Sequence, residues 1–144
     1  MKSLNILVVD DSLITVKKLS SMLEQLGHKV VMTAATGVQA IDAYKTCTPD
    51  LVTMDITMPD MDGIVATRLI RSRFPNAVIL MVTSHGQEKM VLDAIKAGAK
   101  GYLLKPFKMD KLEQLIKETL DRYFPEAKDV LEIDQLNDSE PVIK

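Results

Sequence analysis

Several kinds of residue are scarce in this chain, and each scarcity excludes a class of protein. Cys47 is the only cysteine, so no disulfide can form within the chain, which fits a reducing cytosol. The formal net charge is only -2, which gives no electrostatic reason to bind nucleic acid or an anionic membrane. No apolar run approaches the length of a membrane-spanning helix, and the start is too short and too acidic for a signal peptide. We therefore expect a cytoplasmic protein.

The chain is long enough to form one domain without a disulfide or metal staple. At 144 residues it should bury about two-thirds of the surface of the unfolded chain. There is no tryptophan and only 4% of residues are aromatic, so we expect the nine methionines to fill gaps in the core.

Five short apolar segments predict strands, at residues 4–9, 29–34, 51–54, 77–82 and 101–104. They are apolar throughout rather than alternating, as is typical of strands buried on both faces. Helical spacing and cap signals predict a helix after each strand: between the Ser12 cap and the Gly27 stop, between Thr36 and Pro49, and over 64–73, 88–97 and 110–123. This alternation predicts an α/β fold with a parallel sheet covered on both faces. Within the helices, the spacing predicts that Val38 and Leu69 face inward.

The composition changes at residue 124, which divides the chain into a domain over 1–123 and a segment over 124–144. Acidic residues outnumber basic ones in that segment, and Pro125 and Pro141 bracket it. We interpret it as a solvated acidic tail or the start of a linker, although Val130, Ile133 and Leu136 could line one side of a short helix.

Polar side chains follow four of the predicted strands. Asp10 and Asp11 follow the first, Asp55 the third, Thr83 the fourth and Lys105 the fifth. In a parallel sheet these ends lie on one edge, where ligands bind in open α/β folds. Two carboxylates about 4 Å apart repel by roughly 4 kcal/mol at an effective dielectric near 20. Packing alone gives no reason to gather them, whereas a divalent cation relieves the repulsion.

Ligands that are all oxygen suit Mg²⁺, which typically binds one or two carboxylates together with phosphate oxygens. One carboxylate could then attack phosphorus and form an aspartyl phosphate. The ammonium of Lys105 and the hydroxyl of Thr83 could each meet an oxygen of the transferring group. Taken singly, Asp10 and Asp11 could cap a helix, Thr83 could cap a turn and Lys105 could be a surface residue.

Four motifs at these strand ends resemble one family. They are VVDDS at 8–12, MDITMPDMDG at 54–63, VTS at 82–84 and GYLLKPF at 101–107. Each is weak alone, but their order is specific. The chain is similar to the receiver domain of bacterial response regulators, above all to single-domain chemotaxis regulators of the CheY type, over about residues 4–123. The resemblance implies a doubly wound, flavodoxin-like sheet of five parallel strands in the order 2-1-3-4-5, with five helices.

The resemblance also implies roles for residues. Asp55 would be the phosphoryl acceptor, with the following partners: Asp10, Asp11 and the backbone carbonyl of Thr57 as Mg²⁺ ligands, Lys105 as the phosphate-binding lysine, Thr83 as the switch hydroxyl and Tyr102 as the switch aromatic. The Lys105–Pro106 bond would be cis. His85 could touch the phosphoryl group or a hydrolytic water, although a surface role is the simpler interpretation. His28 and Cys47 are interpreted as structural or surface positions.

The function implied is that of a phosphorylation-activated switch in a two-component system, in chemotaxis. A sensor histidine kinase would phosphorylate Asp55, and the monomeric protein would then change its affinity for a target such as a flagellar motor switch protein. A phosphatase is a further possible partner. The receiver catalyses its own phosphorylation and dephosphorylation, so whether it counts as an enzyme stays open.

Three alternatives remain at the level of the sequence. The chain could be a phosphorelay intermediate or the receiver part of a larger regulator with an output domain. It could be a haloacid-dehalogenase-type phosphatase, although that class has a DxD motif after its first strand and this chain has Asp10-Asp11. A pseudo-receiver that only binds partners is the third, but such proteins lose the acceptor or the lysine, and Asp55 and Lys105 are both present.

Overall fold

The computed structural model describes residues 2–125 and 142–143. The strands are β1 (Asn5–Val9), β2 (Lys29–Ala34), β3 (Leu51–Met54), β4 (Ile79–Thr83), β5 (Gly101–Leu104) and β6 (Val142–Ile143). The helices are α1 (Leu13–Gln25), α2 (Gly37–Cys47), α3 (Gly63–Arg73), α4 (Glu88–Ala97) and α5 (Met109–Tyr123). The helix capping signals of the sequence are confirmed for α1 and α2, where Ser12 and Thr36 accept hydrogen bonds from the third helical amide.

The strands form one parallel sheet in the order β2-β1-β3-β4-β5-β6. The predicted order of the first five strands is therefore confirmed. The sixth strand was not predicted: it lies within the segment interpreted as an acidic tail, and it pairs Val142 with Gly101 and Ile143 with Tyr102. The rest of that predicted tail, residues 126–141 and 144, lies outside the described residues.

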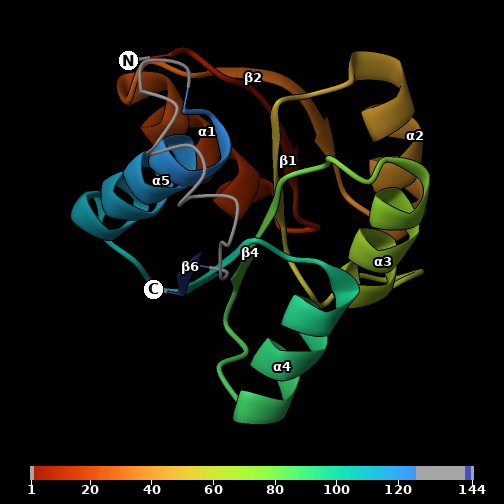
Figure 1. Cartoon of the computed structure of the whole chain (residues 1–144). Helices are drawn as coiled ribbons and strands as arrows, with labels where there is room; N and C mark the ends of the chain where they lie inside the picture. Colours follow the sequence, from red (N-terminus) through yellow and green to blue (C-terminus); the bar gives the residue numbers. More distant parts are fainter. Residues whose placement is uncertain (1, 126–141, 144) are drawn as a thin grey trace.

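Two hydrophobic cores lie on the two faces of the sheet (Figure 1). One core packs α2, α3 and α4 against the sheet through residues such as Ala40, Ile70 and Ala94. The other packs α1 and α5 through residues such as Leu19 and Leu115. Because both faces are covered, β3 and β4 are buried at every position. No helix of the described part of the chain is long and apolar enough to cross a membrane.

Two helical residues predicted to face inward are exposed. Val38 is 49% exposed and Leu69 is 36% exposed. The buried stripe of α2 runs through Ala40, Ala43 and Tyr44, and Val38 lies in the first turn, outside that stripe. The buried residues of α3 include Ala66, Thr67 and Ile70, so Leu69 lies at its margin. In both helices the buried face mixes small residues with large ones, Tyr44 in α2 and Ile70 in α3, so side-chain size alone did not show which face is buried.

Candidate phosphoryl and metal site

The carboxyl ends of β1, β3 and β5 are joined by backbone hydrogen bonds to the neighbouring strands. The amide of Asp55 donates to the carbonyl of Val9, and the amide of Asp10 donates to that of Ala34. On the other side, the amide of Lys105 donates to the carbonyl of Thr83. These bonds extend the ladder to the residues that follow the strands, so the predicted site residues all lie at one edge of the sheet.

Three carboxylates meet at this edge, as predicted. Oxygens of Asp10, Asp11 and Asp55 all lie within 4.8 Å of one another. Asp10 and Asp55 are buried, whereas Asp11 is exposed. Backbone amides hold the two buried groups: Ser12 donates to Asp10 (2.9 Å) and Ile56 donates to Asp55 (2.9 Å). A cluster of oxygen ligands that is open to solvent on one side suits a hard cation that keeps some of its water.

Lys105 reaches this cluster from the end of β5. Its Nζ lies 2.6 Å from Oδ2 of Asp10 and 3.7 Å from Oδ2 of Asp55. The Lys105–Pro106 bond is cis, as the resemblance implied. The ammonium therefore lies between two of the carboxylates, where it could also meet an oxygen of a phosphoryl group on Asp55.

The surroundings of Asp55 disfavour the ionised form of its carboxyl. Burial raises the pKa of its carboxyl above the ordinary value, and the neighbouring Asp10 raises it further. Lys105 and hydrogen bonds from Thr83 and Ile56 act in the opposite direction but do not cancel the rise. The positive charge of Lys105 thus only partly compensates the ionised form of Asp55, and a divalent cation would supply more.

The two predicted switch residues lie next to the cluster. Thr83 is fully buried, and its hydroxyl acts to lower the pKa of the Asp55 carboxyl. The same hydroxyl accepts a hydrogen bond from the amide of His85 at 3.4 Å. Tyr102 is also buried, and its hydroxyl donates to the backbone carbonyl of His85. Burial, with a smaller effect of Asp55, raises the pKa of Tyr102. A chain of contacts therefore leads from the acceptor carboxylate toward β5.

His85 is more involved than its sequence position suggested. Its Nε2 lies 2.6 Å from Oγ1 of Thr57, in addition to the bond that its carbonyl accepts from Tyr102. His85 is a half-buried loop residue, and its ring joins the loops after β3 and β4. The only signal in the sequence was the position of His85 two residues after Thr83.

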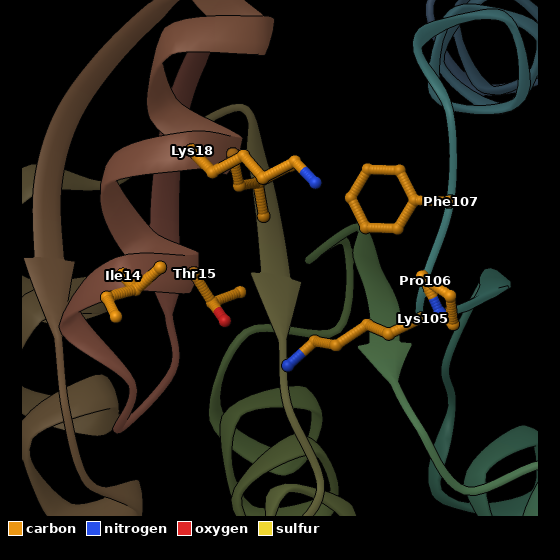
Figure 2. A pocket seen from close by; sticks show the side chains of 7 residues that line it. Ile14, Thr15, Lys18, Lys105, Pro106 and Phe107 are labelled. Atoms are coloured by element: carbon orange, nitrogen blue, oxygen red, sulfur yellow. The ribbon is translucent and has the colours of Figure 1, made fainter.

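An apolar pocket of about 250 Å³ opens beside Lys105, between α1 and the segment after β5. Ile14 and Lys18 on α1 line this pocket, and Figure 2 shows the Lys18 side chain extending toward Phe107, with the nitrogen of Lys105 pointing away from that ring. Ile14 is 81% exposed and its neighbour Leu13 is 66% exposed, which is unusual for large aliphatic residues at the start of a helix. The acidic cluster thus has an apolar flank.

Known proteins are similar to this chain in sequence. The sequence profile of the response regulator receiver domain matches residues 6–117. The chain is 46% identical over 115 residues to chemotaxis protein CheY of Bacillus subtilis (strain 168), which covers 80% of this chain and 96% of that protein. It is 40% identical over 113 residues to chemotaxis protein CheY of Thermotoga maritima, covering 78% of this chain and 94% of that protein.

A solved structure agrees in fold as well as in sequence. The chain superposes on a chain of the CheX-CheY-BeF3-Mg+2 complex from Borrelia burgdorferi with a TM-score of 0.78 and 38% identity, covering 81% of this chain and 88% of that one. The match decides against the phosphatase alternative, because the receiver profile spans the whole five-stranded unit. The acidic cluster fits the phosphorylation site of such a domain. The chain belongs to the response regulator receiver domain family of two-component systems, and its chemotaxis relatives are of the CheY kind.

Proposed function

We propose that Asp55 accepts a phosphoryl group from the phosphohistidine of a sensor kinase and that Mg²⁺ is required for the transfer. The observation that carries this proposal is the cluster of Asp10, Asp11 and Asp55 with the ammonium of Lys105 beside it. Asp10, Asp11, Asp55 and the backbone carbonyl of Thr57 would hold the cation. When bound, Mg²⁺ supplies positive charge to the oxygens of the transferring group.

In the transfer, an oxygen of Asp55 forms a bond to phosphorus while the bond from phosphorus to the histidine nitrogen breaks. Lys105 and Thr83 are placed to interact with two of the phosphoryl oxygens. In the second half of the cycle, water attacks phosphorus, the bond from phosphorus to Asp55 breaks and inorganic phosphate leaves. The domain would thus act on itself, as a switch rather than as an enzyme with an external substrate.

The kinase would approach over the apolar pocket beside Lys105. The exposed Leu13 and Ile14 and the ring of Phe107 offer apolar surface close to the acceptor, and Lys18 adds a positive charge. A partner surface that carries phosphohistidine next to apolar residues would fit this flank. The active-site edge and the docking surface would then be contiguous.

The output would run through Thr83 and Tyr102. A phosphoryl group on Asp55 adds about 1.5 to 2 negative charges, which favours the hydroxyl of Thr83 close to the acceptor. Tyr102 would then be favoured in its buried position, with its bond to the His85 carbonyl. The phosphoryl group shifts this equilibrium only by its differential interaction with the two states. Binding of a target, such as a flagellar motor switch protein, to the surface of α4, β5 and α5 would change accordingly.

We further propose that the protein acts as a cytoplasmic monomer in chemotaxis, since the relatives reported above are chemotaxis proteins of nearly the same length as the matched part. A role as phosphorelay intermediate or as part of a larger regulator would use the same site. Affinity capture with beryllofluoride-treated and untreated protein tests this part: a motor protein enriched by treatment supports chemotaxis, and a histidine phosphotransfer protein supports a relay.

The acceptor is tested by mass spectrometry after incubation with acetyl phosphate and Mg²⁺. The wild type should gain one phosphoryl group, and Asp55→Asn should gain none. Asp42→Asn is the matched control, because Asp42 is an exposed aspartate on α2. Equal labelling of Asp55→Asn and the wild type would refute the site, and loss of labelling should also follow removal of Mg²⁺ with a chelator.

A further inference from the structure

The loop that follows the proposed acceptor is fastened at its neck. The amide of Gly63 donates to the carbonyl of Ile56 at 2.7 Å, which closes the loop between β3 and α3. A Cβ on Gly63 would lie only 1.9 Å from the backbone oxygen of Asp55. The two ends of the loop are therefore in contact, and residues 57–62 form the loop between them.

The tip of the loop is fastened separately, to α2. Oδ1 of Asp60 accepts a hydrogen bond from the amide of Gly37 at 2.9 Å, and Oδ2 accepts one from the amide of Val38 at 3.2 Å. These amides belong to the first turn of the helix, where no carbonyl of the helix can reach them. Asp60 is exposed, so hydrogen bonding rather than burial holds it in place.

A close backbone contact accompanies these bonds. A Cβ on Gly37 would lie 2.7 Å from Cβ of Met61 and 2.8 Å from its carbonyl oxygen. The loop therefore lies directly against the first turn of α2, and glycine is the residue that permits this approach. Desolvation acts to raise the pKa of the Asp60 carboxyl, but hydrogen bonds from the amides of Gly37 and Val38, with smaller effects of the Thr36 side chain and the Met61 backbone, together hold it below the ordinary value.

Capping of α2 does not by itself explain Asp60. The hydroxyl of Thr36 already accepts the hydrogen bond from the amide of Gln39 and caps the helix from its own side. Asp60 comes from another loop, 23 residues away in the sequence. Its effect is to join the acceptor loop to α2, with Thr57 lying between the fastened neck and the fastened tip.

We propose that Asp60 is a positioning residue for the metal and phosphoryl site, because its carboxylate fixes the loop that presents Thr57. The inference rests on the proposed function, in which the carbonyl of Thr57 binds Mg²⁺. With the neck closed at Gly63 and the tip held at Asp60, the carbonyl of Thr57 has little freedom to move away from Asp55. Without the Asp60 bonds, the loop would sample positions in which this ligand is lost.

The test compares the Mg²⁺ affinities of the wild type, Asp60→Ala and Gln39→Ala, each measured by NMR titration with Mg²⁺ alone. Removal of an outer group that orients a ligand typically weakens metal binding by 10- to 100-fold, and we expect about tenfold for Asp60→Ala. Gln39→Ala removes the hydrogen bond that its side chain accepts from the amide of Ala35 at the same helix end, but none from the loop. It should therefore leave the Mg²⁺ affinity unchanged. Asp60→Asn keeps an acceptor for Gly37 and should recover part of the affinity.

Labelling by acetyl phosphate provides a second readout. In Asp60→Ala the labelling rate should fall at limiting Mg²⁺ and return to the wild-type rate at saturating Mg²⁺, since only the ligand geometry is weakened. Gly37→Ala serves as a second variant that displaces Met61 without touching the carboxylate, and it should also weaken Mg²⁺ binding.

Unchanged Mg²⁺ affinity in folded Asp60→Ala, or an equal loss in Gln39→Ala, would overturn the proposal and leave Asp60 as a helix cap. If Asp60→Ala does not fold, the Mg²⁺ affinities of Asp60→Asn and Gly37→Ala are compared with that of the wild type. Unchanged affinity in both variants would then overturn the proposal. Failure of the proposed function is a separate result: the wild type itself would then bind no Mg²⁺ or accept no phosphoryl group.

Discussion

Nε2 of His85 and Oγ1 of Thr57 lie 2.6 Å apart, so a hydrogen bond joins the loops that follow β4 and β3. Both residues lie close to the acceptor: Thr57 is two residues after Asp55, and the amide of His85 donates a hydrogen bond to the hydroxyl of Thr83, which influences the pKa of Asp55. The pair therefore forms one side of the space in which a phosphoryl group on Asp55 would lie. We infer that the pair limits the access of water to an acyl phosphate from this side.

We predict that His85→Ala shortens the lifetime of the phosphorylated protein, because removal of the ring opens this side of the pocket to water. The rate of phosphoryl loss should rise by about threefold to tenfold, which corresponds to roughly 1 kcal/mol in the barrier. Mass spectrometry at successive times after removal of acetyl phosphate measures this rate directly.

Substitutions of Thr57 serve as controls for this prediction. Thr57→Ser keeps the hydroxyl and should behave like the wild type, whereas Thr57→Val keeps the bulk, loses the hydrogen bond and should give a smaller increase than His85→Ala. Slower loss in His85→Ala would show that the ring orients the attacking water instead of excluding it.

Asp55→Asn should stabilise the metal-free protein at neutral pH. Burial raises the pKa of Asp55 in the folded state, so the folded protein binds this proton more tightly than the unfolded one. Stability is therefore lost as the pH rises through the unfolded pKa of about 3.9 toward the folded pKa. Replacement by the neutral amide removes this loss. Thermal unfolding should show a higher Tm for Asp55→Asn at pH 7 and no difference at a pH low enough to protonate Asp55.

Mg²⁺ should reverse this order. A ligand that binds only the folded state stabilises it by about 2.7 kcal/mol at 100 times its Kd. The wild type should gain this stability, and Asp55→Asn should gain much less because it lacks one of the three carboxylates. An equal rise of Tm with Mg²⁺ in both proteins would place the ion away from Asp55.

The sequence predicted that the carboxylates and the lysine lie together, because each follows a buried strand of a parallel sheet. Asp10, Asp55 and Lys105 follow strands whose carboxyl ends must lie on one edge, so their proximity depends on topology alone. The contacts of His85 with Thr57 and of Asp60 with Gly37 were not predicted. They join residues 28 and 23 positions apart through loops, and no periodicity specifies the path of a loop.

The errors within helices have a different origin. Val38 and Leu69 have side chains well suited to a core, yet they are exposed while the smaller Ala40 and Ala66 are fully buried. Close approach of a helix to a sheet favours small side chains, and hydrophobicity alone does not show which side of a stripe faces inward. The short strand β6 gave no signal either, since two residues are too few to show a period.

Gly63→Ala should destabilise the fold although alanine is the better helix former. At an ordinary helical position the exchange of glycine for alanine stabilises by about 0.5–1 kcal/mol. At Gly63 the new Cβ would lie 1.9 Å from the backbone oxygen of Asp55, which cannot rotate away. We expect a net loss of about 1–3 kcal/mol and reduced labelling of Asp55, because the acceptor's own backbone has to shift.

Urea unfolding measures the stability of this variant through the midpoint. Gly86→Ala is the matched control: its Cβ would lie 3.1 Å from a methyl carbon of Leu104, an exposed side chain that can rotate. A gain in stability in Gly63→Ala would contradict the close contact with Asp55.

His28 should make the protein less stable in mild acid. It is buried, Nδ1 accepts a hydrogen bond from the amide of Leu4 at 3.1 Å, and Nε2 has no hydrogen-bond partner within the described residues. Burial lowers the pKa of the imidazole below its ordinary value near 6.5. The unfolded state therefore binds this proton more readily, so the stability that is fully present above pH 6.5 falls as the pH drops from there toward the folded pKa.

His28→Asn tests this assignment, because its side-chain oxygen can accept the bond from Leu4 without titrating in this range. The free energy of unfolding, measured with urea from pH 7.5 down to pH 5, should decline less steeply in His28→Asn than in the wild type. Parallel slopes for His28→Asn and the wild type would mean that protonated His28 is tolerated in the fold, and the acid sensitivity would then have to come from other groups.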